Sequence, residues 1–251
     1  MSTYSARRVG RRWFLTQTGR GALGIAVLGS SACTGSGSSV DEVSVPASSG
    51  SAPATEKLAW SRVNLGFVAA YVLVRGREAA IVDTGVGGSA DEIGAVLDKA
   101  GPGWEGVRHV VLTHKHPDHV GSIGDVLTQA TRATGYAGVG DLAEVHGPRQ
   151  LKPLGNGDEV FGLQVVATPG HTAGHLSVFD QETGVLVAGD ALTNMGRLAG
   201  SNPQFTEDKA AAVASVRKLA QLAPKTILVG HGDPVTSGAT SELSRLASSL
   251  T

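Results

Sequence analysis

The sequence predicts an α/β domain over residues 56–251. Short apolar runs rich in β-branched residues recur along this part of the chain, as expected of buried strands. Between them lie stretches in which apolar residues recur every three to four positions, as expected of amphipathic helices. A His or Asp directly follows five of the predicted strands. Since a sheet delivers such strand ends to a common edge, the sequence also predicts a site at that edge.

Composition limits the possible partners. The chain has 251 residues, of which 41% are hydrophobic, and this is ample for a core. The net charge is −1, but residues 1–33 hold five Arg and no acidic residue, so their removal leaves 16 basic and 22 acidic residues and a net charge of −6. An acidic mature chain is a poor candidate for nucleic-acid binding, and we expect none. Cys33 is the single cysteine, so the sequence excludes an internal disulfide and a thiolate ligand in the domain.

Residues 1–33 resemble a targeting segment. The run Arg11–Leu15 resembles a twin-arginine export signal, and the apolar stretch Gly21–Gly29 is too short to span a membrane. The small residues before Cys33 resemble a lipoprotein processing site, with Ser30 where Leu is usual. We therefore expect twin-arginine export and a lipid anchor at Cys33 on the outer face of the cytoplasmic membrane. The alternative is cleavage after Ala32, which gives a periplasmic or extracellular protein.

The remaining chain divides into a linker and the domain. Residues 34–55 are rich in Gly, Ser, Pro and Ala and predict a flexible linker. Expected strands cover 67–74, 79–83, 107–112, 133–139, 160–167, 176–179, 184–188 and 225–229. Expected helices cover 89–100, 120–130, 207–222 and 241–250, and Ser89 and Gly101 are the N-cap and the stop of the first.

The densest group of candidate ligands follows the predicted strand 107–112. His114, His116, Asp118 and His119 lie within six positions, which is unexpected for a loop without a function. In an extended segment alternate residues share a face, so His114 and His116 can point at one ion. The chain then turns at Pro117, and Asp118 and His119 can point at a neighbouring ion. Imidazole and carboxylate ligands suit zinc and its neighbours in the transition series.

More candidates come from distant parts of the sequence. Asp83, His114, His171, Asp190 and His231 each follow an apolar strand, and most lie beside a glycine. A single His or Asp at a strand end is usually a loop residue or a cap. Five of them with the same local pattern, around a cluster of four ligands, predict one metal site at the sheet edge.

Four motifs in the same order resemble those of the metallo-β-lactamase superfamily of metal-dependent hydrolases. They are His114-x-His116-x-Asp118-His119, the stretch Thr168–His175 (TPGHTAGH), Gly189-Asp190 and Gly230-His231-Gly232. The resemblance covers roughly residues 60–235. It implies a four-layer αββα sandwich, in which helices flank two mixed, mainly antiparallel sheets and the metals lie at one edge.

The resemblance also implies a role for each residue. One zinc ion would be held by His114, His116 and His171, and a second by Asp118, His119 and His231, with Asp190 bridging both. Asp83 would orient a ligating histidine, and His175 would be structural, while no motif places His109 or His146 in the site. We expect two Zn²⁺ per chain, with Fe or Mn as alternatives.

This ligand set would support hydrolysis. Two divalent ions about 3.5–4 Å apart lower the pKa of a shared water towards neutrality. We expect the bridging hydroxide to attack the carbonyl carbon of a small-molecule ester, thioester, lactone or lactam, with a metal beside the developing oxyanion. Asp118 is the expected catalytic residue, because it could orient the hydroxide and relay its proton to the leaving group.

Two alternatives to a dinuclear hydrolase remain. One is a mononuclear iron enzyme resembling persulfide dioxygenases, although the Arg-rich stretch usual after their Gly-Asp motif is not evident here. The other is a non-catalytic zinc-binding lipoprotein. Within the superfamily, an Asp at position 190 resembles the glyoxalase-II and lactonase branches more than the zinc β-lactamases. Substrate choice would lie in residues 65–67 and 194–205, with Trp60 and Phe205 as candidates for an apolar wall.

Overall fold

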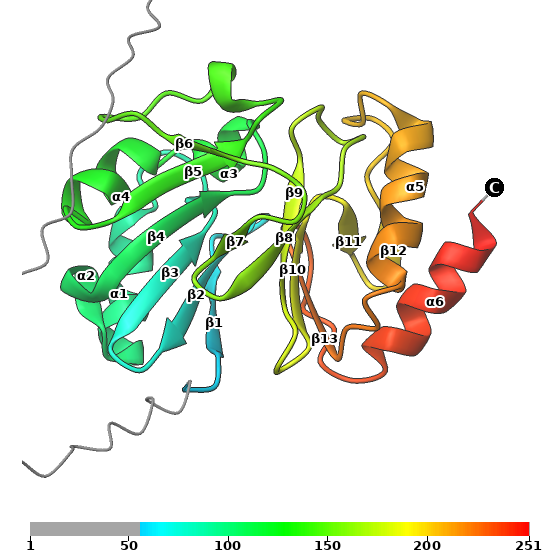
Figure 1. Ribbon diagram of the computed structural model, residues 1–251, viewed down its shortest axis with the longest axis horizontal. Coiled ribbons are helices and arrows are strands. Elements are labelled where there is room, and N and C mark those ends of the chain that lie inside the picture. The colour runs from blue at the N-terminus through cyan, green and yellow to red at the C-terminus, as the bar shows by residue number, and fades with distance from the viewer. Residues whose placement is uncertain (1–55, 251) are drawn as a thin grey trace, which may run out of the picture. The chain divides into compact units, whose positions relative to one another are not determined.

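Two β-sheets face one another in this protein, and helices cover the outer face of each (Figure 1). The structure is a computed structural model that describes residues 56–250. The predicted targeting segment 1–33 and linker 34–55 lie outside the described residues. The four layers agree with the sandwich that the sequence motifs imply.

The first sheet has six strands in sequence order. Its first three strands are antiparallel, and the pairs from the third strand to the sixth are parallel. The strands are β1 (Ala59–Asn64), β2 (Ala69–Arg75), β3 (Glu78–Val82), β4 (Val107–Leu112), β5 (Thr134–Gly138) and β6 (Lys152–Leu154).

The second sheet has five strands in the order β13-β10-β9-β8-β7, and only the pair β10–β13 is parallel. A separate hairpin of two short strands follows β10. The sheet strands are β7 (Glu159–Val160), β8 (Leu163–Ala167), β9 (Leu176–Asp180), β10 (Val185–Gly189) and β13 (Thr226–Val229), and the hairpin consists of β11 (Leu192–Asn194) and β12 (Leu198–Gly200).

The helices lie on both sides of the sheets. On the side of the first sheet are α1 (Ala90–Ala100), α2 (Gly103–Gly106), α3 (Pro117–Val120) and α4 (Ile123–Gln129) (Figure 1). On the side of the second sheet are α5 (Lys209–Ala220) and α6 (Ala239–Ser249). None of the helices within residues 56–250 combines the length and apolar character needed to cross a membrane.

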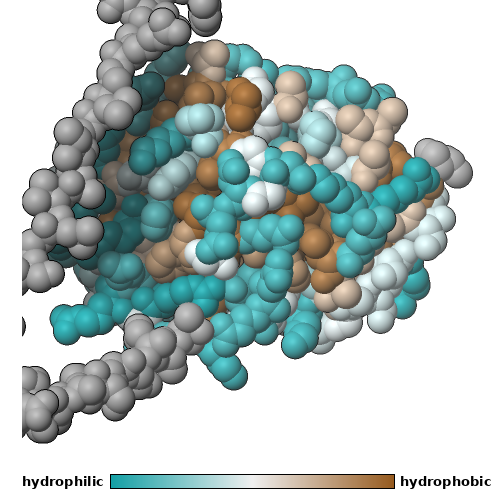
Figure 2. Space-filling model, in the orientation of Figure 1, coloured by the Kyte–Doolittle hydropathy of each residue, from teal (hydrophilic) through white to brown (hydrophobic). Residues whose placement is uncertain are grey.

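Three apolar cores hold the four layers together. Alternate residues of β2 show the division, because Val72 packs towards α1 and α4 while Tyr71 packs between the sheets. This is the period of two that a strand buried on both faces requires. The third core joins the second sheet to α5 and α6, with Leu186 of β10 and Leu219 of α5 among its members. In Figure 2 hydrophilic residues cover most of the face turned to the viewer, with apolar residues visible between them.

The sequence-based elements differ from the structure at several positions. Of the helix expected over 120–130, only residues 123–129 form one helix, α4, while Val120 ends the separate helix α3. Between them the hydroxyl of Ser122 donates to the carbonyl oxygen of Val86 and accepts from the backbone N–H of Ser89, which holds the break. Ser89 is the N-cap of α1, but its own hydroxyl also donates to Val86. The short strands β1, β6, β11 and β12 were not predicted. Trp60 does not form a wall of the site, since it packs at the core between the sheets, edge-on to Tyr71.

Candidate metal centre

One edge of the two sheets collects the predicted site residues. Asp83 follows β3 and His114 follows β4 in the first sheet, while His171, Asp190 and His231 follow β8, β10 and β13 in the second. These three strands of the second sheet run in one direction, because β8 and β10 are both antiparallel to β9 and β13 is parallel to β10. The strand ends therefore face one another across the two sheets. The backbone N–H of Leu176 donates to the carbonyl of Thr113 at 2.9 Å and joins the sheets at this edge.

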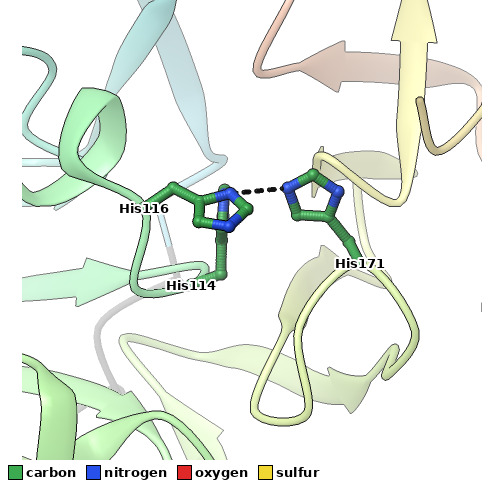
Figure 3. A group of neighbouring side chains, drawn as sticks. All are labelled: His114, His116 and His171. Carbon is green, nitrogen blue, oxygen red and sulfur yellow. Dashed lines mark hydrogen bonds between the residues drawn. The ribbon is translucent and has the colours of Figure 1, made fainter. Parts of the chain in front are cut away.

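His114, His116 and His171 form a first group of three imidazoles. Nδ1 of His116 lies 3.1 Å from Nε2 of His114 and 2.9 Å from Nε2 of His171. Figure 3 shows His116 and His171 approaching from separate loops with their ring nitrogens facing each other. His114 and His171 are each 1% exposed, whereas His116 is half-buried.

Asp118, His119 and His231 form a second group. Nε2 of His231 lies 3.3 Å from Oδ2 of Asp118 and 3.4 Å from Nε2 of His119. His119 is fully buried, whereas the side chains of Asp118 and His231 are 26% and 22% exposed. The second group therefore opens towards solvent on one side.

Asp190 lies between the two groups. Its Oδ2 is 3.4 Å from Nε2 of His171 in the first group and 3.2 Å from Nε2 of His231 in the second. Its Oδ1 is 3.3 Å from Nε2 of His119, yet this atom is buried without a hydrogen-bond partner among residues 56–250. A buried carboxylate oxygen without a partner is costly, and a cation shared by both groups would satisfy it.

Outer hydrogen bonds fix which nitrogen of His114 carries the proton. A carboxylate only accepts, so the hydroxyl of Thr113 donates to Oδ2 of Asp83 at 2.8 Å. The Thr113 oxygen must then accept from Nδ1–H of His114 at 3.0 Å. The lone pair of His114 therefore lies on Nε2, the atom that faces the first group.

The same argument applies to His171. The hydroxyl of Thr206 donates to the carbonyl of Asn202 at 2.6 Å, so it accepts from the hydroxyl of Ser201 at 2.7 Å. Ser201 then accepts from Nδ1–H of His171 at 2.9 Å. The lone pair on Nε2 again points into the first group, where it is available for a metal ion.

The two histidines of the second group are oriented by oxygen acceptors. Nδ1–H of His119 donates to Oδ2 of Asp83 at 2.8 Å, and Nδ1–H of His231 donates to the carbonyl of Phe67 at 2.7 Å. Asp83 also accepts from the backbone N–H of Thr113 at 2.7 Å, so its carboxylate supports both groups. This is the orienting position that the sequence motifs imply for Asp83.

His175 lies behind the site and faces neither group of ligands. Its Nε2 accepts from the backbone N–H of Asp190 at 3.0 Å, and its Nδ1–H donates to the hydroxyl of Thr168 at 2.8 Å. Burial lowers the pKa of His175 to about 3, so the ring is neutral. It therefore holds the turn that presents Asp190. His109 lies elsewhere, between the sheets against Tyr136 and Phe161.

Burial and charge give the two groups different proton affinities. Burial lowers the pKa of His114 well below 6.5 and that of His171 to about 4, so both rings are neutral at physiological pH. Hydrogen bonds to Asp118 and Asp190 raise the pKa of His231 to about 10. Burial lowers the pKa of His119, but the nearby carboxylates more than offset this and raise it well above 6.5. The second group thus attracts a positive charge, which a metal ion would supply.

Asp141 completes the support of the site, and sequence reasoning missed it. Its carboxylate is fully buried and accepts from the backbone N–H of Lys115 at 3.1 Å, from the hydroxyl of Thr172 at 2.6 Å and from the backbone N–H of Gly174 at 2.7 Å. It therefore ties the loop of His114 and His116 to the loop of His171. Asp141 follows β5 at the same sheet edge, beside glycine, so the strand-end pattern could have found it.

The donor set fits a pair of divalent ions. Ligands 2.0–2.1 Å from a tetrahedral zinc ion lie about 3.3 Å from one another. The separations within the two groups, 2.9–3.4 Å between ring nitrogens, are of this size. All the facing atoms are ring nitrogens or carboxylate oxygens, and Asp190 contacts both groups. Residues His114, His116 and His171 would hold one ion, and residues Asp118, His119 and His231 the other.

A cavity of about 670 Å³ opens onto the two groups. His116, Asp118, His171, Asp190 and His231 lie at its base, and this size suits a small organic molecule. The hairpin β11–β12 and the segment that follows it form one wall. The backbone N–H of Asn194 donates to the carbonyl of His231 at 3.0 Å and attaches the hairpin to the site.

Comparisons with known proteins agree with this geometry. Residues 63–231 match the family model described as the metallo-beta-lactamase superfamily. The chain is 29% identical over 221 residues to the probable metallo-hydrolase YflN of Bacillus subtilis, covering 68% of this chain and 81% of that protein. It is 35% identical over 146 residues to the hydroxyacylglutathione hydrolase of Ectopseudomonas mendocina, and this match covers 56% of this chain and about half, 53%, of that enzyme.

A solved structure extends the comparison to the metal. The structure of TTHA1623 in a di-iron-bound form superposes with a TM-score of 0.59 at 26% sequence identity, covering 71% of this chain and 93% of that one. Two metal ions are thus present in a protein of similar fold and sequence. Because the family model spans the whole sheet edge from β1 to His231, the chain belongs to the metallo-beta-lactamase superfamily, whose members bind divalent metals and are mostly metal-dependent hydrolases.

Proposed function

We propose that this protein is an exported, binuclear zinc hydrolase that cleaves a small-molecule ester, thioester, lactone or lactam. The position of Asp190 carries this proposal. One of its oxygens lies within 3.4 Å of a histidine in each of the two ligand groups, so one carboxylate can bridge two ions. A ligand group that served a single ion would not require a shared carboxylate.

The bound ion pair would supply hydroxide at neutral pH and polarise the substrate carbonyl. The chain's own residues prepare the reaction. The outer hydrogen bonds of His114, His119, His171 and His231 direct their Nε2 atoms into the site. Such bonds fix ring direction before the substrate arrives, so no reorganisation is needed during the reaction.

Asp118 is the proposed proton-relay residue. Burial raises the pKa of its carboxyl, but the hydrogen bond from His231 and the charge of His119 lower it below 3.8 on balance. The group is therefore ionised at neutral pH. Its side chain is 26% exposed at the base of the cavity, so it can hold a proton between the ligands and the leaving group of a substrate.

Iron is the alternative metal. The di-iron form of TTHA1623 supports a pair of iron ions in a site of this fold, and the mononuclear iron enzyme remains the competing function. The hydroxyacylglutathione hydrolases among the relatives support a thioester as one substrate class. Zinc is preferred here because neutral imidazole and carboxylate ligands at tetrahedral separations suit it.

A substrate panel tests the hydrolase. We expect the zinc-loaded full chain to turn over at least one of a chromogenic ester, thioester, lactone or cephalosporin, and a chelator should abolish this activity. Asp118→Asn should lower kcat by about 10²- to 10⁴-fold, the usual contribution of a positioned acid–base group. Turnover that survives both changes refutes the mechanism. Oxygen uptake with a persulfide, without hydrolysis, would favour the iron enzyme.

Export and anchoring are a separate part of the proposal. The twin-arginine motif and the residues before Cys33 support secretion with a lipid on Cys33, which would keep the domain on the outer face of the membrane. Mass spectrometry of the mature N-terminus tests this. A diacylglyceryl-modified Cys33 is expected, and an N-terminus at an unmodified Cys33 contradicts the anchor.

A further inference from the structure

Large apolar side chains gather at the mouth of the cavity. Four large hydrophobic residues are exposed among residues 56–250, namely Phe67, Val139, Met195 and Phe205. Three of them, Phe67, Met195 and Phe205, line the cavity above the two ligand groups. Their exposed fractions are 62%, 74% and 62%. Exposed apolar groups that cluster at one opening mark a binding site for an apolar group.

The backbone fixes the positions of these three residues. The ring of Phe67 stacks on that of His231 with centroids 6.1 Å apart and an interplanar angle of 10°, and its carbonyl accepts from the same histidine. Met195 lies in the turn of the β11–β12 hairpin, next to Asn194, whose side chain donates to the carbonyl of Asp233 at 2.7 Å. The backbone N–H of Phe205 donates to the carbonyl of Asn202 at 3.1 Å.

The cavity lining contains no Lys or Arg among the described residues. The nearby cations are already paired, since Arg62 contacts Asp233 at 2.8 Å and Lys115 contacts Glu144 at 2.7 Å. Arg197 is exposed in the hairpin turn but does not line the cavity. Away from the metal centre, a carboxylate on the substrate would therefore meet no lysine or arginine side chain in this cavity. Burying such a charge against the apolar mouth without a partner is costly.

We propose that the substrate is a neutral ester or lactone with an extended apolar group, and that Phe67, Met195 and Phe205 bind this group. The proposal rests on the hydrolase function proposed above and narrows its substrate class. Water adds to the acyl carbon, the acyl carbon–oxygen bond breaks, and the leaving alcohol takes the proton. Anionic thioesters and lactams that carry a carboxylate are disfavoured.

Binding of an apolar probe tests the cavity without turnover. The probe is N-phenyl-1-naphthylamine, a neutral fluorophore, added to the full chain with and without zinc. We expect saturable binding that weakens at least about fivefold in Met195→Ala and in Phe205→Ala, because each change removes apolar contact area. Val139→Ala is the matched control, since Val139 is also exposed but does not line this cavity, and its binding should equal that of the wild type. Equal binding in all four proteins, or none, overturns the proposal.

A series of p-nitrophenyl esters tests the substrate class. From acetate to octanoate, kcat/KM should rise about two- to fourfold per methylene, the range that burial of a methylene in a partly open cavity allows. Met195→Ala and Phe205→Ala should lower the octanoate-to-acetate ratio, and Val139→Ala should keep it. A faster reaction with the anionic hemisuccinate than with the butyrate overturns the proposal. If no ester reacts but a thioester or cephalosporin does, the substrate class proposed here is wrong and the hydrolase function stands. If none of these substrates reacts while the probe still binds, the hydrolase function fails and the apolar binding site stands.

Discussion

The carboxylate of Asp141 accepts a hydrogen bond from the hydroxyl of Thr172 at 2.6 Å, although 31 positions separate the two residues. The same carboxylate accepts from the backbone of Lys115 and of Gly174. One buried side chain thus joins the loops that carry His116 and His171. The first ligand group depends on a bond between loops from different sheets.

Asp141→Asn should weaken both the fold and the metal site. An amide has one oxygen, so its NH₂ group must face a donor that the carboxylate now satisfies. Leaving one buried N–H without a partner costs about 1–3 kcal/mol, which urea unfolding of the full chain can measure. Metal affinity should fall about 10- to 100-fold, as for other residues that support ligands. Asp125→Asn, an exposed change in α4, is the control and should alter stability by less than about 0.5 kcal/mol. Equal effects of the two changes would contradict the role of Asp141.

Asp83→Asn should weaken binding of the second ion more than binding of the first. Asp83 has a φ of 63°, a conformation that Asn tolerates, so the backbone is preserved. Its amide can still accept one hydrogen bond, but the carboxylate that orients His119 is lost. We expect the second ion to be released at about 10- to 100-fold higher free metal concentration, with a smaller change for the first ion. Metal analysis across a series of buffered zinc concentrations measures both. A parallel loss of both ions would show that Asp83 does not favour the second group.

Gly230→Ala should disturb the centre by steric contact alone. A Cβ at this position would lie 2.3 Å from Oδ1 of Asp190 and 2.7 Å from Cε1 of His119, so both side chains must move. A displacement of this size should lower kcat/KM by about 10²-fold or more. Gly124→Ala is the matched control, because nothing lies within 4 Å of a Cβ there, and removing a glycine from α4 should stabilise by about 0.5–1 kcal/mol. Wild-type activity in Gly230→Ala would show that the site accommodates the methyl group without displacing Asp190 and His119.

Metal binding should release protons mainly at the second group. Hydrogen bonds to Asp118 and Asp190 raise the pKa of His231 to about 10, so without an ion this ring carries a proton at neutral pH. Nearby carboxylates also raise the pKa of His119 well above 6.5, against the effect of burial. An ion must displace these protons, so its affinity should rise with pH up to about 10.

The first group should behave differently. Burial holds the pKa of His171 at about 4 and lowers that of His114 well below 6.5, so above about pH 6.5 these rings bind an ion without releasing a proton. Calorimetric titration in two buffers with different ionisation heats distinguishes the groups. One binding step should depend on the buffer and the other should not. Two buffer-independent steps would contradict the assigned protonation.

The sequence predicts the fold class and most of the longer strands, but it does not predict the shortest elements. The strand β10 is predicted from its sequence because burial on both faces leaves a continuous apolar run. The three-residue strands β11 and β12 are not predicted, because so short a segment shows no periodic pattern. Their structure depends on the hydrogen bonds between them and on the attachment of Asn194 to His231. The break between α3 and α4 is also not predicted, because it depends on hydrogen bonds from Ser122 to a loop that is distant in the sequence.

The strand-end pattern predicted which ligand-type side chains would meet, and the structure brings all of them to one edge. The same pattern applies to Asp141, which follows β5 after Val139 and Gly140, but this carboxylate was not among the predicted site residues. The pattern could not reveal the Ser201–His171 bond or the apolar cavity mouth. Those features depend on where a loop folds back, which tertiary contacts decide.

Metal content is the most direct test of the central claim, that two ion sites share Asp190. The measurement is elemental analysis of the mature protein purified without added metal, repeated for Asp190→Asn. We predict about two divalent ions per chain, mainly zinc, and a clear loss in the variant. A single iron per chain, or two ions that remain bound equally well without the Asp190 carboxylate, would contradict the account.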